Sequence, residues 1–168
     1  MSNLLPLPIG KTSSSSQLAA DVGKVYLAGG KLYRLVKFTS AITDPESKVV
    51  VTAFSAGVPT WSVDTTTTGA SAAVAGVIPA SLTTDIAASA YGLILIKGAG
   101  SVLSSTTAVT DGDVLQTATV AGRADEIATT VTPLDLVKVR FGKATNTAAV
   151  TSAGLAITCL VDVGTGLG

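Results

Sequence analysis

The fold class of this chain is decided by the stretch Tyr91-Gly92-Leu93-Ile94-Leu95-Ile96-Lys97-Gly98. A short apolar run bounded by glycines is typical of a β-strand with both faces buried. Further strand signals lie at residues 136–142 and 155–161, and Asp111-Gly112-Asp113 is a turn that leads into residues 114–117. Because such signals recur at short intervals and no long amphipathic helix separates them, we expect an all-β fold, either a compact antiparallel β-barrel or a sandwich.

The clearest hairpin lies nearer the N-terminus. Residues 25–27 and 32–38 flank Gly29-Gly30, and glycines supply the positive φ angles that a tight turn requires. The segment Gly98-Ala99-Gly100-Ser101 lacks the lysine and hydroxyl residue that end a phosphate-binding loop, so it is interpreted as a tight turn after the strand at 91–98. Further strands are expected at residues 48–54, 61–63 and 74–79.

The composition divides the chain into three parts. Residues 1–22 contain two prolines and a serine run and are expected to form an extended N-terminal arm. Residues 23–68 are expected to form a small β unit, and residues 69–168 the main β-barrel domain. Aliphatic side chains of the arm would be poorly placed in water, and an arm that docks on a neighbouring chain would bury them. The alternatives are that the arm folds back on its own domain or that it is a disordered terminus. The candidate anchors for docking are Leu4, Leu5, Leu7 and Ile9.

The composition also favours association with other protein. Of the 168 residues, 47% are hydrophobic and only 13% are charged, whereas charged residues make up about 25% of a typical soluble protein. A sparsely charged surface indicates that much of it faces other subunits, although serine and threonine hydroxyls also keep such a surface wet. The formal net charge of zero predicts no general attraction to nucleic acid, and no stretch approaches the roughly 20 apolar residues of a membrane helix.

The chain has few residues that perform chemistry. It contains no histidine, which excludes Ser-His-Asp and Cys-His catalysis and histidine-rich zinc sites. The single cysteine, Cys159, lies in an apolar run and is expected to be a buried thiol. Asp111 and Asp113 are fewer ligands than calcium takes and are better explained by the turn, and nothing fixes the separation of Asp125-Glu126 from Asp162 as an acid–base pair. We therefore expect no enzymatic activity, no catalytic or metal-binding residue and no cofactor.

Several motifs follow one another along the second half of the chain. They are Ala75-Gly76-Val77, the strand at 91–98, Asp111-Gly112-Asp113-Val114-Leu115, Gly122-Arg123, Phe141-Gly142-Lys143-Ala144 and the strand at 155–161. Their order resembles that of small capsid decoration, or cement, proteins of tailed bacteriophages. The resemblance implies a virion structural protein, made in the host cytoplasm and placed on the outside of the phage head. It further implies a homotrimer that binds the major capsid protein and stabilises contacts between its subunits.

On this interpretation, the candidate anchors of the arm contact a capsid protein or a sister subunit, and the protein acts by shape and repeated contact. Residues 25–61 have no counterpart in the motif order, which leaves a separate role open for them. The alternative from another class is a receptor- or glycan-binding head-fibre or tail module that uses exposed loops at residues 65–72 and 129–134.

Overall fold

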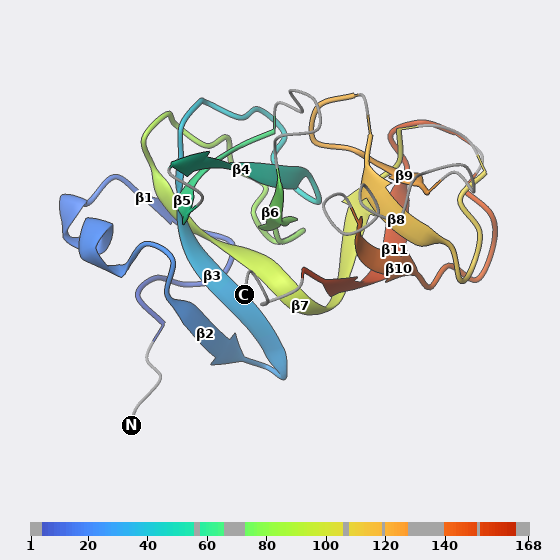
Figure 1. Ribbon diagram of the computed structural model, residues 1–168, viewed down its shortest axis with the longest axis horizontal. Coiled ribbons are helices and arrows are strands. Elements are labelled where there is room, and N and C mark those ends of the chain that lie inside the picture. The colour runs from blue at the N-terminus through green and yellow to red at the C-terminus, as the bar shows by residue number, and fades with distance from the viewer. Residues whose placement is uncertain are drawn as a thin grey trace.

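Nearly all of the regular structure is β-strand (Figure 1). The computed structural model describes residues 5–55, 58–65, 73–105, 108–118, 120–127, 140–150 and 152–163. In these ranges the one helix is a short 3-10 helix, η1 (Ser16–Asp21). The strands are β1 (Thr12–Ser13), β2 (Val25–Ala28), β3 (Lys31–Phe38), β4 (Val49–Ser55), β5 (Val58–Asp64), β6 (Ala73–Val77), β7 (Tyr91–Leu103), β8 (Val114–Thr117), β9 (Ala124–Glu126), β10 (Arg140–Ala144) and β11 (Ala156–Asp162). The expectation of an all-β fold is confirmed.

Five of the strands close into a barrel. β7 pairs antiparallel with β3 over residues 32–37 and meets β6 at one residue pair, Val77 and Leu95. β4 pairs antiparallel with both β6 and β5, and β5 returns to β3 through two parallel residue pairs. The order β3-β5-β4-β6-β7 and back to β3 therefore leaves no open edge in this part of the sheet. The expected barrel is confirmed, with one parallel pairing that the hairpin signals did not predict.

β7 joins this barrel to a second part of the sheet. Its first half belongs to the barrel, and its second half pairs antiparallel with β11 from Lys97↔Asp162 to Leu103↔Ala156. The sheet then continues through β10 and β8 to β9. In Figure 1, β7 runs from the barrel towards the end of the molecule formed by β8 to β11, so one strand connects both parts.

β7 continues through the glycines at which a turn was predicted. The interpretation of Gly98-Ala99-Gly100-Ser101 as a tight turn is wrong, because all four residues belong to β7. A Cβ atom on Gly98 would lie 2.9 Å from Cγ of Lys31, and one on Gly100 would lie 2.6 Å from Cδ2 of Leu95. These glycines therefore make room for side chains that cross the strand, and they do not reverse the chain.

The predicted hairpin at Gly29-Gly30 is confirmed. β2 and β3 pair from Val25↔Arg34 to Ala28↔Lys31, so the two glycines form the whole loop, with φ angles of 56° and 73°. Two positive φ angles are what a type I′ hairpin turn requires. β2 lies at one end of the strand order, so its other edge is open within the part of the chain that the structure describes.

Strands from both expected β units share the barrel. β3, β4 and β5 come from residues 23–68, whereas β6 and β7 come from residues 69–168. The boundary expected near residue 68 therefore falls between β5 and β6, which both belong to one barrel. The N-terminal segment is part of the same fold, because β1 pairs with the start of β7. One continuous core extends through both parts of the sheet and includes Leu35, Phe38, Ile94 and Phe141.

Candidate interaction surfaces and a surface pocket

The candidate anchors of the N-terminal segment lie on the chain's own core. Leu7 is 7% exposed and belongs to the core, and Leu5 and Ile9 pack against the core while partly exposed. Leu4 lies outside the described residues. Of the alternatives for the arm, folding back on its own domain describes residues 5–22. Since a buried side chain has no surface left to bury on a partner, Leu7 is not available as an anchor in this conformation.

A row of exposed side chains crosses four neighbouring strands at the β8–β11 end. Leu160 of β11 lies opposite Ala99 of β7 on one side and opposite Lys143 of β10 on the other, and Lys143 lies opposite Val114 of β8. Directly opposite residues of antiparallel strands point to the same face. Leu160 is 52% exposed and Val114 is 39% exposed, and Ala99 and Lys143 are exposed as well. We call Ala99, Leu160, Lys143 and Val114 the outer row.

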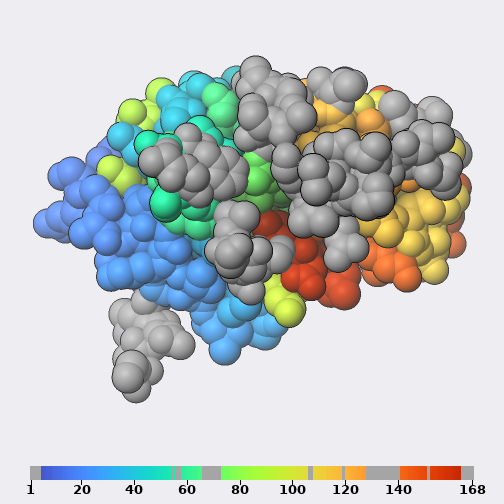
Figure 2. Space-filling view, in the orientation of Figure 1, coloured from blue at the N-terminus to red at the C-terminus, as the bar shows by residue number. Residues whose placement is uncertain are grey.

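Alternation along β11 produces this exposure. Ile157, Cys159 and Val161 are buried, and the residues between them are exposed. Segments of β10 and β11, orange to red, reach the molecular surface in Figure 2. The sequence did not single out Leu160, because residues 155–161 are apolar almost throughout and their outward face depends on the register with β7.

The open edge of β2 carries a second group of exposed apolar side chains. Val25 is 43% exposed and Leu27 is 55% exposed. Edge strands of natural proteins usually carry a charged side chain that discourages pairing with another chain. β2 has none within Val25–Ala28, and the nearby Lys24 forms an ion pair with Asp21. This edge is therefore a second candidate surface for contact with another protein.

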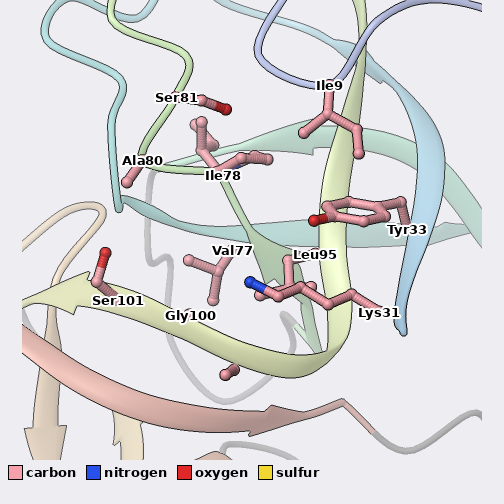
Figure 3. A pocket seen from close by; sticks show the side chains of 12 residues that line it. Ile9, Lys31, Tyr33, Val77, Ile78, Ala80, Ser81, Leu95, Gly100 and Ser101 are labelled. Carbon is pink, nitrogen blue, oxygen red and sulfur yellow. The ribbon is translucent and has the colours of Figure 1, made fainter. Parts of the chain in front are cut away.

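A pocket of about 450 Å³ lies where β3, β6 and β7 meet (Figure 3). Its walls are mainly aliphatic, and Lys31 is the one charged residue among the described residues that line it. Figure 3 shows the side chains of Lys31 and Tyr33 reaching into this space from β3. Burial raises the pKa of the Tyr33 hydroxyl, so this group stays neutral at neutral pH. Sequence reasoning missed the pocket, because its lining draws on three strands and includes residues 99–101, which were expected to form a turn.

Arg34 and Trp61 form a stacked pair between β3 and β5. The guanidinium carbon of Arg34 lies 3.7 Å from the centroid of the Trp61 ring. Trp61 has a positive φ of 52° and lies against Gly23, where a Cβ atom would be 2.6 Å from its Cδ1. Arg34 is 8% exposed, and burial lowers its pKa. We assign the stack a structural role, because it joins side chains of β3 and β5.

The residues considered for chemistry are not brought together. Asp113 accepts hydrogen bonds from the backbone N–H and the hydroxyl of Thr110, at 2.7 and 2.8 Å, which is a turn role. Asp125 of β9 and Asp162 of β11 have β8 and β10 between them in the sheet. Cys159 is buried as expected, and burial raises its pKa to about 12.

The described residues offer neither a cluster of metal ligands nor a membrane-spanning helix. Within those ranges, no group of three or more histidine, cysteine, aspartate or glutamate residues could hold a metal ion. None of the helical structure described is long and apolar enough to span a bilayer. The exposed loops considered for receptor binding, residues 65–72 and 129–134, lie almost entirely outside the described residues.

Comparisons with known proteins give a likeness in structure but none in sequence. No protein-family profile matches the sequence, and a search of curated proteins finds no match. Among solved structures, the N base of the head fibre gp8.5 of bacteriophage phi29 is similar, with a TM-score of 0.47 and 12% sequence identity. The match covers 79% of this chain and 94% of that chain. A likeness of this degree carries over no residue role.

Proposed function

We propose that this protein is a structural component of a tailed-bacteriophage virion. In this proposal it is a decoration, or cement, protein that binds the outer surface of the head and stabilises contacts between subunits of the major capsid protein. The observation that carries the proposal is the outer row, an exposed and largely apolar stripe that crosses four strands. The order of sequence motifs supports the same assignment through its resemblance to phage decoration proteins.

The outer row of one copy is too small to hold a protein on a surface by itself, so the contact must be repeated. Complete burial of a leucine or valine side chain contributes about 1.5–3 kcal/mol, and Leu160 and Val114 begin only about half exposed. Together they contribute on the order of 1.5–3 kcal/mol. Weak sites that engage at the same time raise the overall affinity through effective concentration. We therefore propose a homotrimer at threefold positions of the head, where each copy repeats the same contact.

The sparse charge of the chain supports contact with other protein. Charged residues make up 13% of the sequence, and a surface with little charge is stable when another subunit covers it. In this proposal the protein acts by shape and repeated contact. It has no catalytic step, no cofactor, and no nucleic-acid or membrane partner.

The proposal is tested on particles of the encoding phage from which the gene has been deleted. Purified protein is added to these particles, bound copies are counted by quantitative mass spectrometry, and their position is found by cryo-electron microscopy. We expect threefold density at regular positions on the head exterior, and a higher temperature of DNA release from decorated heads. Density at the tail or at fibre tips, together with binding on a glycan array, would support the receptor-binding module instead.

Two matched variants connect this assay to the outer row. Leu160→Asp places a charge at the centre of the row, and we expect most of the head occupancy to be lost. Val58→Asp makes the same kind of change at a valine that is 64% exposed and lies on β5, outside the row. We expect this control to retain occupancy. Equal binding by both variants would remove the outer row from the proposal.

A further inference from the structure

The pocket at the junction of β3, β6 and β7 has walls that belong to the core. Val77, Ile78 and Leu95 line it, and their exposed fractions are 1%, 0% and 4%. Close-packed side chains of this kind hold their positions without a ligand. The volume of about 450 Å³ lies within the range of pockets that bind small organic groups. The structure therefore presents a preformed apolar space at the surface.

Lys31 supplies the charge of this space. Its stem crosses β7 at Gly98, where a Cβ atom would lie 2.9 Å from Cγ of Lys31, and Figure 3 shows its amino group extending into the pocket. Within the described part of the chain, Lys31 makes no ion pair. An ammonium beside apolar walls is stabilised by an anion that can approach it there. One positive charge is balanced by one carboxylate, whereas phosphate sites commonly add backbone N–H groups or further cations.

Hydroxyl groups complete the polar lining. Tyr33, Ser81 and Ser101 all line the pocket. The Ser101 hydroxyl lies 2.6 Å from the hydroxyl of Ser47, which fixes its position. Hydroxyls both donate and accept hydrogen bonds, so they can bind peptide N–H and C=O groups beside a carboxylate. The combination of one ammonium, a few hydroxyls and aliphatic walls is suited to a short piece of polypeptide.

We propose that this pocket binds an extended segment of a partner protein in which a glutamate or aspartate stands beside an aliphatic residue. The carboxylate pairs with Lys31, and the aliphatic side chain packs against Val77 and Leu95. Charge complementarity to the single ammonium selects this occupant over a neutral or basic segment. The inference goes beyond the virion role and does not depend on it, since the described residues that line the pocket all come from a single copy of the chain.

The test uses the isolated full-length protein, labelled with ¹⁵N, and heteronuclear NMR. The probes are acetyl-Leu-Glu-Leu-amide, its neutral isostere acetyl-Leu-Gln-Leu-amide, and free 4-methylpentanoate. We expect the Glu peptide to cause saturable shifts at the amides of Lys31, Ala99 and Ser101, with the Gln peptide binding about fivefold more weakly. The free acid should bind more weakly than the Glu peptide, because it lacks the peptide groups that the hydroxyls bind.

Three variants locate the effect. Lys31→Met should abolish the difference between the Glu and Gln peptides, whereas Lys37→Met, on the same strand but outside the pocket lining, should retain it. Ala80→Trp fills the space from an exposed lining position and should block every probe. The proposal is overturned by equal binding of the Glu and Gln peptides, or by equal effects of the two lysine variants. Tighter binding of the free acid than of the peptide would identify a small-molecule site and overturn the protein partner.

Discussion

The same substitution at two strand glycines should have different outcomes. Gly142 of β10 and Gly100 of β7 both have φ angles outside the positive region. A Cβ atom on Gly142 would lie 2.7 Å from the backbone oxygen of Leu160. A Cβ atom on Gly100 would lie 2.6 Å from Cδ2 of Leu95. The obstacle is hydrogen-bonded backbone in the first case and the end of a side chain in the second.

The expected magnitudes follow from what must move. Alanine in a strand is favoured over glycine by about 0.5–1 kcal/mol, because glycine loses more backbone entropy on folding. In Gly142→Ala, β10 and β11 must separate, and overpacking of this kind costs about 1–3 kcal/mol. We therefore expect a net loss of about 1–2 kcal/mol. In Gly100→Ala, Leu95 moves off its rotamer at a cost of about 0.5–1.5 kcal/mol, which roughly cancels the gain.

Urea unfolding measures the difference. At equal m-values, Gly142→Ala should have a free energy of unfolding about 1–2 kcal/mol below that of Gly100→Ala, and its Tm should be lower by about 2–4 °C for each kcal/mol. Circular dichroism of the folded variants controls for a change of fold. If Gly100→Ala loses as much stability as Gly142→Ala, the distinction between a backbone and a side-chain obstacle is wrong.

Buried and conformationally constrained residues lead to three more predictions. Because burial raises the pKa of Cys159 from 9.0 to about 12, its thiol should resist a thiol reagent at pH 8 until urea unfolds the protein. The contribution of this thiol to the free energy of unfolding, measured as the difference from Cys159→Ala, should be constant below pH 9 and fall from there towards pH 12. Arg34→Lys should lose about 1 kcal/mol and shift the fluorescence of Trp61, the single tryptophan, since lysine has no planar group to stack. Gly30→Ala should lose about 1 kcal/mol in thermal unfolding although no atom lies within 4 Å of its Cβ position, because its φ is +73°. A reactive native thiol, an unchanged Trp61 spectrum or an undiminished Tm would contradict them in turn.

The fold class could be predicted because its signals are local. Two glycines between apolar runs predict the β2–β3 hairpin, and the apolar stretch that starts at Tyr91 predicts the first half of β7. The parallel contact between β3 and β5 could not be predicted, since it joins strands separated by β4 and has no turn residue to mark it. Glycine is also ambiguous: Gly30 takes a positive φ to turn the chain, whereas Gly100 leaves space for Leu95.

The candidate surfaces could be predicted only in part. Low charge indicates a covered surface but not its position, because that position depends on which side chains point outwards. In β11, a shift of one residue against β7 would exchange Leu160 for Val161 at the surface. The apolar residues of the N-terminal segment show the reverse case. Leu7 is apolar, as an anchor on a partner would be, but it is buried in the core of its own chain. The pocket depends on β3, β6 and β7 meeting, which no single segment encodes.

Central and edge strands offer different kinds of contact to a partner. The outer row and the open edge of β2 therefore differ in how a partner can bind them. β11 is paired with β7 on one side and with β10 on the other, so a partner reaches Leu160 through side chains alone. β2 has an open edge in the described chain, where a partner strand can also form backbone hydrogen bonds. Contact through side chains depends on apolar area and tolerates a change of shape. Leu160→Met should therefore retain head occupancy that Leu160→Asp removes, and equal loss in both variants would mean that the outer row is not the contact.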